Sequence, residues 1–282
     1  MAIPEKPNLS LVHAFDQDDD SFLETVVEYT KLTKVSAMAL GERVSRIMAD
    51  HDILNMMTRS WKPFPGAKVV PLPQFEPPQE SFASVVARRR SVSTLKRDFH
   101  EGPISLEQLA GTLTMTYGPT TVLKRPDGTK IQEMRATSSG GGIYPTELYV
   151  LAFDVEGLES GAYHFHPINN TLEVIRLGDL RSEFIAAATY PGLAKTCAVA
   201  VVLTTVFRRT AMKYRNRALR FALLDTGGVC TSLYLAGTAM GVDTCALGGF
   251  YDNKVSEIIR THPVDEPTSL CFLLGRAEEQ PR

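Results

Sequence analysis

A basic segment between Phe207 and Arg220 contains the residues best suited to handling a proton or an anion. On a helix with about 100° between residues, four of its cations fall within roughly 80° and form one stripe: Arg209, Lys213, Arg217 and Arg220. Side chains of like charge repel one another unless something compensates them, and no acid stands four residues away before Asp225. We therefore expect a phosphate or an acidic substrate against this stripe.

A second group of cations, Arg88-Arg89-Arg90, precedes Ser91 at the end of a helix predicted over residues 82–90. Guanidinium groups and a hydroxyl can hold a phosphate through charge-assisted hydrogen bonds. Arginines at the C-terminus of a helix also compensate the helix dipole. The residue types alone leave both interpretations open.

Two glycine segments border predicted strands. Residues 138–142 read Ser-Ser-Gly-Gly-Gly ahead of a strand, and residues 246–250 read Ala-Leu-Gly-Gly-Phe at the end of another. Glycines let the backbone approach a flat or anionic ligand closely, and neighbouring hydroxyls and amides can hydrogen-bond it. No Gly-Lys-Ser/Thr follows, and the first segment leads into a strand, so neither a P-loop nor a dinucleotide motif is present. A plain turn is the alternative for residues 138–142.

Histidines and cysteines indicate no metal centre. His164 and His166 stand two residues apart, which places both on one face of a strand. No further ligand stands at a recognisable spacing, so we expect exposed imidazoles and no metal. The cysteines form no C-x-x-C pair, so we expect buried structural thiols: Cys197, Cys230, Cys245 and Cys271.

The bulk composition disfavours nucleic acid and membranes as partners. A formal charge of -2 over 282 residues offers no attractive global field, and the basic stripe lacks interleaved aromatic residues. The N-terminus has no basic segment followed by an apolar run, and no stretch approaches the roughly 20 apolar residues of a membrane helix. We expect a soluble, cytoplasmic protein.

Hydrophobic patterns predict the elements that must position these residues. Residues 1–20 resemble a solvated tail or a cap, and helices are expected from residue 21 and over 40–58. The prolines of residues 62–80 predict an extended linker. Residues 105–108 form a capping box ahead of a helix. Strands are expected over 147–154, 196–207, 243–249 and 268–275, and helices over 209–240 and 252–261. This order predicts an α+β (mixed α/β) fold, with a central sheet flanked by helices.

The order of these segments over residues 80–276 resembles the SagB-type dehydrogenase branch of the nitroreductase superfamily, which includes azoline oxidases of thiazole and oxazole peptide biosynthesis. Arg89-Arg90-Ser91 is similar to the start of its Arg-Arg-Ser-x-Arg motif, and residues 138–141 to its Pro-Ser-Ala-Gly stretch. Residues 161–165 are similar to its Gly-x-Tyr-His-Tyr strand. Lys213-Tyr214 matches its Lys-Tyr pair. Ser93 and Ser138 depart from the pattern, replacing a basic residue and a proline.

The resemblance implies a nitroreductase-like fold, FMN as cofactor and a set of site residues. Lys213 and Tyr214 would be catalytic, either one serving as the base. The implied cofactor-binding residues are Arg89, Arg90, Ser91, Ser138, Ser139, Gly140, Gly141, Leu247, Gly248, Gly249 and Arg276. Arg89 and Ser91 would hold the phosphate, residues 139–141 the polar edge of the flavin, and Gly248 would donate its N–H near N5. Lys96 or Arg97 is a candidate to replace the missing charge at Ser93.

The resemblance also implies a homodimer with FMN between two subunits. The long helix is the candidate dimer element, because small residues at Gly227, Gly228, Thr231 and Gly237 allow close approach; a buried helix within one subunit is the alternative. Residues 1–80 would form an N-terminal helical extension with a Pro-rich linker, and residues 81–282 the FMN-binding domain.

The expected activity is two-electron oxidation of a peptide, peptidyl or carrier-bound intermediate, of the azoline-to-azole type, in natural-product biosynthesis beside other biosynthetic enzymes. A nitroreductase or quinone reductase using NAD(P)H is one alternative. A flavin-less scaffold that presents a peptide to a partner enzyme is another, because Ser93 and Ser138 depart from the pattern.

Overall fold

The computed structural model describes residues 21–58, 60–95, 97–124, 126–128 and 130–277. Seven strands form one sheet in the order β1-β8-β7-β5-β9-β11-β10, and every neighbouring pair is antiparallel. Its strands are β1 (Val69–Pro71), β5 (Thr146–Ala152), β7 (Gly161–His166), β8 (Thr171–Leu177), β9 (Val199–Thr205), β10 (Val242–Leu247) and β11 (Thr268–Arg276). Strand β9, in the interior of the sheet between β5 and β11, is buried throughout, as its β-branched run predicts.

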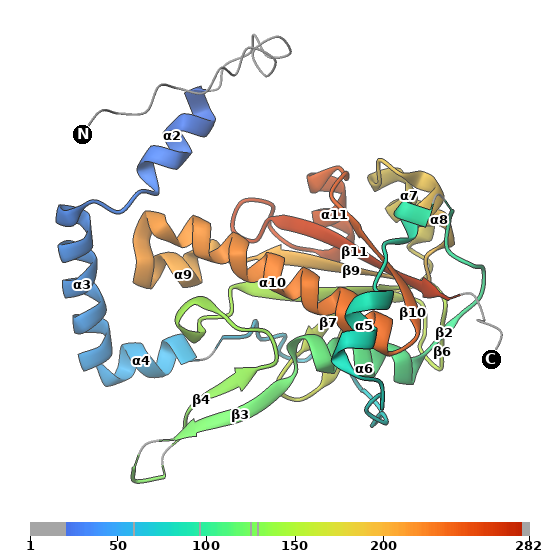
Figure 1. Ribbon diagram of the computed structural model, residues 1–282, viewed down its shortest axis with the longest axis horizontal. Helices are drawn as coiled ribbons and strands as arrows, with labels where there is room; N and C mark the ends of the chain where they lie inside the picture. The colour runs from blue at the N-terminus through green and yellow to red at the C-terminus, as the bar shows by residue number, and fades with distance from the viewer. Residues whose placement is uncertain (1–20, 59, 96, 125, 129, 278–282) are drawn as a thin grey trace.

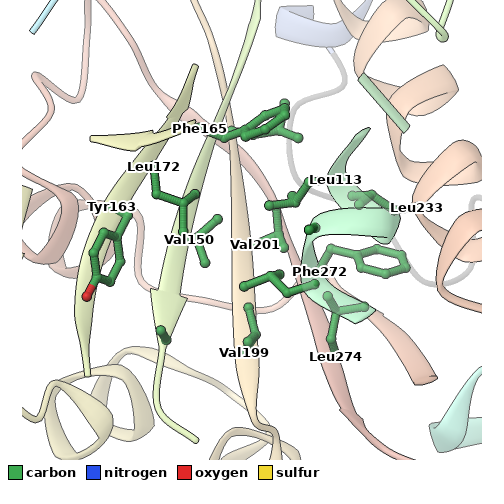
Figure 2. Close-up of a cluster of buried hydrophobic side chains, with 14 of the residues drawn as sticks. Leu113, Val150, Tyr163, Phe165, Leu172, Val199, Val201, Leu233, Phe272 and Leu274 are labelled. Carbon is green, nitrogen blue, oxygen red and sulfur yellow. The ribbon is translucent and has the colours of Figure 1, made fainter. Parts of the chain in front are cut away.

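Helices cover both faces of this sheet. On one face lie α6 (Leu106–Tyr117) and the long α10 (Ala218–Ala239), where Leu113 and Leu233 pack against Val201 (Figure 2). The opposite face is covered by α7 (Arg181–Ala187), α8 (Pro191–Thr196) and α11 (Asp252–Ile259). Successive residues of β9 alternate between these two cores, as the pleat of a strand requires. The predicted mixed α/β architecture is confirmed.

The helix expected over residues 209–240 is not continuous, so that prediction was wrong. Helix α9 (Phe207–Tyr214) ends at Arg215, a 3₁₀ turn covers Arg215–Arg217, and α10 begins at Ala218. Arg215 has φ 51° and ψ -133°. This conformation lies outside the helical region, so the chain changes direction at Arg215. The cations on either side of this break therefore do not share one straight stripe.

The N-terminal segment packs beside α9 (Figure 1). It contains α2 (Ser21–Tyr29), α3 (Lys34–Ala49) and α4 (His51–Thr58). The proline-rich stretch is extended, as predicted, and it also supplies β1, which pairs with β8 at the edge of the sheet. Helix α5 (Phe82–Arg88) follows and crosses the C-terminal part of α10. The predicted boundary between two domains at residue 80 stays a prediction.

Smaller elements complete the fold. A hairpin of β3 (Pro119–Lys124) and β4 (Lys130–Arg135) projects from the body (Figure 1), and β2 (Ile104–Ser105) pairs in parallel with β6 (Val155–Glu156). The 3₁₀ turns are η1 (Val92–Leu95), η2 (Gly140–Gly142) and η3 (Arg215–Arg217). Among the helices of the described residues, none combines the length and the apolar character needed to span a bilayer.

Candidate functional site

The glycine loop at η2 lies directly against the Lys213-Tyr214 pair. A Cβ atom added to Gly141 would stand 2.4 Å from the Tyr214 hydroxyl and 2.9 Å from Lys213 Nζ. Gly141 also has φ 71°, a conformation that favours glycine. The Lys213 Nζ atom lies 5.3 Å from the centroid of the Tyr214 ring. The fold therefore joins two segments that are about 70 residues apart in sequence into one cluster.

An aspartate on α10 holds this loop in place. Ser139 Oγ donates to Asp225 Oδ2 at 2.6 Å, and the Gly140 N–H donates to Asp225 Oδ1 at 3.1 Å. The Tyr144 N–H donates in turn to Ser139 Oγ at 2.8 Å. Burial raises the pKa of Asp225, and the two bonds from the loop oppose that rise. Two groups expected to contact a cofactor are thus already bonded within the chain, whereas Ser138 is exposed.

A second cluster lies near the other end of α10. The Arg89 guanidinium stands 5.2 Å from the centroid of the Tyr234 ring, and the Tyr234 hydroxyl accepts a bond of 2.8 Å from the Ala246 N–H. Ser91 Oγ donates to Cys245 Sγ at 3.3 Å. Arg89 and Ser91 therefore line the strand β10, which ends next to Gly248.

The other arginines of this segment have partners. Arg88 pairs with Glu80, and the hydrogen bond from Arg88 is the main reason that the pKa of Glu80 falls to about 2. Arg90 donates to the carbonyl groups of Ala87 and Arg89 at 2.9 and 2.8 Å, so it satisfies the helix end, which was the alternative interpretation. Arg88 and Arg90 also border a cavity of about 740 Å³.

Arg97 and Lys96 are the two candidates to replace the missing charge at Ser93. Arg97 pairs with Asp243 at 2.7 Å, and it borders the same cavity. Lys96 lies outside the described residues. Ser93 itself is exposed, and its Oγ lies 3.0 Å from the Oγ of Ser91.

The two glycines after β10 differ in their surroundings. A Cβ on Gly248 would meet no atom within 4 Å among the described residues, and Gly248 is exposed. A Cβ on Gly249 would stand 2.0 Å from Thr189 Oγ1, which donates to the Gly249 carbonyl at 2.8 Å. Gly249 is thus required by packing, and only Gly248 leaves its backbone open to a ligand. Leu247 is buried in the core, and its side chain is not part of an open site.

Arg276 ends the last strand of the sheet. Its side chain packs against Gly102, where an added Cβ would stand 3.1 Å from a terminal guanidinium nitrogen. The residue also makes further interactions within the chain. Its implied contact with a cofactor stays a prediction.

The chain itself supplies partners for three cations of the basic stripe, so the expectation that an external anion compensates the whole stripe was wrong. Arg209 forms an ion pair with the buried Glu147. Arg217 donates to the Thr30 carbonyl at 3.1 Å, and Arg220 donates to Thr30 Oγ1 at 2.8 Å. These two arginines therefore hold the end of α2, where helix carbonyl groups need donors. Glu147 and Thr30, both distant in sequence, thus supply the partners that the segment itself does not contain.

Arg209 belongs to a buried ionic network that also contains Glu147, His164 and Glu173. Glu147 Oε2 lies 2.9 Å from His164 Nε2, and Glu173 Oε2 lies 2.7 Å from His164 Nδ1. Burial alone would raise the pKa of Glu147, but the charge of Arg209 and the bond from His164 outweigh it and hold the pKa at about 2. Burial opposes protonation of His164, yet its bonds to both carboxylates raise its pKa.

The expectation of exposed imidazoles was wrong, because His164 and His166 are both buried. Register explains the difference: His164 stands directly opposite Glu173 on β8. Only the pairing of strands could reveal this partner, since neither histidine has an acid close by in sequence. Among the described residues, no group of His, Cys, Asp and Glu side chains is arranged to hold a metal ion.

The expectation of buried thiols is confirmed for three cysteines and holds in part for the fourth. Cys197, Cys245 and Cys271 are buried, and Cys230 is half-buried. All four are free. Burial raises the pKa of Cys197 to about 12, which keeps this thiol protonated and unreactive at neutral pH.

With this architecture established, the chain belongs to the nitroreductase family, which it matches over residues 86–276. A candidate nitroreductase of Methanocaldococcus jannaschii is 28% identical over 210 residues, covering 74% of this chain and 97% of that protein. The crystal structure of a putative nitroreductase from Anabaena variabilis is similar to this chain, with a TM-score of 0.62 and 22% identity. The similarity covers 76% of this chain and 42% of the Anabaena chain. The predicted nitroreductase-like fold is confirmed, and the family supports an oxidoreductase.

Peptide-processing proteins are also similar to this chain. The trifolitoxin-processing protein TfxB of Rhizobium leguminosarum bv. trifolii is 27% identical over 149 residues, which cover 51% of this chain and 40% of TfxB. The microcin B17-processing protein McbC of Escherichia coli is 27% identical over 129 residues, covering 44% of this chain and 47% of McbC. The match thus spans less than half the length of each. A chain of the E. coli microcin synthetase McbBCD complex shares the fold, with a TM-score of 0.55 and 18% identity over 94% of this chain.

Proposed function

We propose that this chain is an FMN-dependent oxidase or dehydrogenase of the SagB type, acting on a peptide, peptidyl or carrier-bound intermediate. The observation that carries the proposal is the contact of Lys213 and Tyr214 with Gly141. That contact places two proton-handling side chains beside a loop whose backbone can meet a flat ligand. The similarity to TfxB and McbC supports a peptide as substrate.

The second cluster, which contains Arg89 and Ser91 and which we call the arginine cluster, fits the phosphate of FMN. Among the described residues no carboxylate pairs with Arg89, whose charge remains available to an anion, and the Ser91 hydroxyl lies on the same strand edge. Gly248 leaves an open backbone beyond them. When bound, FMN would supply the two-electron redox chemistry. The chain would orient the substrate, and Lys213 or Tyr214 would take the proton lost from it.

The two clusters lie too far apart along α10 to be neighbours in one subunit. Phe221 lies against Gly140 of the loop and Tyr234 lies against Arg89, and the step of 13 residues from Phe221 to Tyr234 corresponds to about 20 Å of helix. Gly227 lies midway and is exposed, and a Cβ there would meet no described atom within 4 Å. Leu224, one turn earlier, is 70% exposed.

We therefore propose a homodimer in which a two-fold axis passes near Gly227 and brings the loop of one chain toward the arginine cluster of the other. Thr231 is exposed on the same surface. The other small residues of α10 have a different role. Gly228 packs against Thr137 and Gly237 against Thr244, both within the chain. Those two glycines were expected at the dimer contact, but side chains of the same subunit already fill the space beside them.

The dimer is tested by Leu224→Glu, which places a charge on the exposed face. We expect a monomer by sedimentation that also loses FMN, because each site would need both subunits. Val264→Glu, at a position 78% exposed on another part of the surface, is the matched control and should stay dimeric with FMN bound. A wild-type monomer that retains FMN would exclude this assembly.

The activity is tested with a peptide that contains a thiazoline or oxazoline ring. The FMN-loaded chain should convert it in air to a product lacking two hydrogen atoms, detected by mass spectrometry. The Lys213→Ala, Tyr214→Phe double variant should keep its flavin spectrum and lose this conversion. Full turnover by the double variant would remove Lys213 and Tyr214 from the mechanism.

A second candidate function is a nitroreductase or quinone reductase that uses NAD(P)H. It is favoured by the M. jannaschii relative, which matches over 97% of its length. Rapid loss of flavin absorbance on addition of NADH or NADPH, followed by reduction of a quinone or nitroarene, would support it. Slow loss of flavin absorbance with NADH or NADPH, together with oxidation of the azoline peptide, would support the oxidase. A purified chain that is colourless and takes up no added FMN would instead indicate a scaffold.

A further inference from the structure

A pocket of about 440 Å³ lies between the N-terminal helices and the segment after Lys213. One wall comes from residues 29–40, at the end of α2 and the start of α3, and the other from residues 214–217. We call it the extension pocket. Tyr214 belongs to its wall, and the Tyr214 hydroxyl reaches the glycine loop at Gly141. A molecule in the pocket would therefore lie next to a residue of the proposed catalytic pair.

Hydrogen bonds anchor the N-terminal helices on both sides of Tyr214. Arg43 Nε on α3 donates to the Met212 carbonyl at 2.7 Å. On the other side Arg217 donates to the Thr30 carbonyl at 3.1 Å. The wall formed by the extension is thus attached to the same short segment that carries Lys213 and Tyr214. This attachment gives residues 21–58 a role that a simple linker to the main domain would not have.

The lining of the extension pocket combines apolar surface with positive charge. Tyr29 is 71% exposed and Leu32 is 49% exposed, although both are large apolar side chains. Lys31, Arg215 and Arg217 also line the pocket, and none of its described lining residues is an acid. Glu28 compensates Lys31, and Arg217 is bonded to a carbonyl, so Arg215 carries the charge that remains open to an anion.

A second cavity of about 580 Å³ shares Ala39 and Arg215 with the first. Its wall combines apolar side chains with charges of both signs, which are Arg43, Arg46, Glu42 and Asp50 beside Arg215. Arg215 therefore stands where the two cavities meet. Its φ of 51° places it at the break between α9 and η3, away from the regular helix surface.

We propose that the extension pocket binds an acidic segment of a peptide substrate, with an aliphatic or aromatic side chain against Tyr29 and Leu32 and a carboxylate at Arg215. This proposal rests on the proposed function, since Tyr214 is there the residue next to the reacting group. Apolar contact supplies affinity, and the cations select acidic over basic segments.

The test measures binding separately from turnover. The probes are a short fluorescein-labelled peptide that alternates glutamate with leucine and phenylalanine, and a counterpart with lysine in place of glutamate. With the full chain loaded with FMN, fluorescence anisotropy should show binding of the acidic peptide and at least tenfold weaker binding of the lysine peptide.

Two variants and two matched controls locate the site. Arg215→Glu and Leu32→Asp should each weaken binding of the acidic peptide about tenfold or more. Arg208→Glu makes the same charge change on α9, at a side chain 85% exposed, and Val35→Asp makes the same kind of change on α3 at a position 79% exposed. Neither control residue lines the pocket. Both should bind within twofold of the wild-type chain.

Three results would overturn the proposal: no binding of either peptide, equal binding of both, or binding that survives both pocket variants. Failure of the proposed function has a different signature. A chain that takes up no FMN, or that binds FMN without oxidising an azoline, can still be measured in the same anisotropy assay. A flavin-containing, active chain that ignores the acidic peptide would reject the extension pocket alone.

Discussion

The two arginine-rich segments look alike in sequence, but Arg209 in one and Arg89 in the other have opposite surroundings in the fold. In residues 207–220, Arg209 reaches the buried Glu147, and Arg217 and Arg220 hold the end of α2. In residues 88–91, Arg89 stacks on Tyr234 without a carboxylate partner among the described residues. A run of cations therefore indicates an anion, but the anion can be the protein's own. What distinguishes a binding arginine is a guanidinium that the rest of the chain leaves uncompensated.

The largest expected effect concerns Arg209 and its buried partner Glu147. Glu147→Gln would leave Arg209 buried without its countercharge and should lower the free energy of unfolding by about 3–5 kcal/mol. Urea denaturation followed by circular dichroism measures this. Glu42→Gln, which breaks an exposed pair with Arg46, should change stability by less than about 1 kcal/mol. Equal effects of the two variants would mean that burial of the Arg209–Glu147 pair does not decide its contribution to stability.

The next effect concerns Arg89, which has no carboxylate partner among the described residues. Arg89→Ala should weaken FMN binding by roughly 10- to 150-fold, the range of a hydrogen bond to a charged group, with little loss of stability. Fluorescence titration of the flavin-free chain measures the affinity. Arg90→Ala is the matched variant. It should weaken binding less, because Arg90 already donates to the carbonyl groups of Ala87 and Arg89. The opposite ranking would assign the phosphate to Arg90.

A smaller effect is the pH dependence of the buried network. The folded-state pKa of His164 is raised above its ordinary value of 6.5, so protonated His164 stabilises the fold. This contribution is fully present below pH 6.5 and is lost as the pH rises through the raised pKa, by at most about 1.4 kcal/mol per pH unit for one proton. Urea denaturation across this range should show the decline. A His164→Gln variant should lack it, and an unchanged slope in that variant would assign the decline to another group.

The smallest effect is expected at Arg208, which is adjacent to Arg209 in sequence but lies outside the buried network of Glu147 and His164. Its side chain is 85% exposed and stands 3.4 Å from Asp265. Arg208→Ala should change the free energy of unfolding by less than about 1 kcal/mol and leave FMN affinity unchanged. Thermal denaturation and the same flavin titration check both points. A large loss at Arg208 would mean that position along the segment, and not burial of the partner, decides the outcome.

Sequence patterns predicted most of the scaffold because those patterns are local. The β-branched run of β9 and the capping box of Ser105 and Gln108 each specify an element within a few residues. The break at Arg215 was missed because it lies in a segment whose residue types all suit a helix. Nothing close in sequence marks that one residue as the place where the chain leaves the helical conformation.

The site was predictable in part. The types and order of its residues single out Lys213, Tyr214 and the glycine loop, and the structure brings these three together. The role of Asp225 was missed, although it is the first acid after the basic segment, because an acid at that position could equally have compensated an arginine. Its bonds to the loop became visible only when α10 was placed beside η2.

The amino-acid order alone therefore determines four strands of the main sheet, most of the helices and the segments that could meet a flavin, because these depend on periodicity and residue type over short stretches. The tertiary structure decides which charges remain available. Strand register puts His164 opposite Glu173, and helix packing puts Thr30 under Arg217 and Arg220. Electrostatic compensation acts through space over a few ångströms, so partners far apart in sequence decide whether an arginine supports the fold or can hold a ligand.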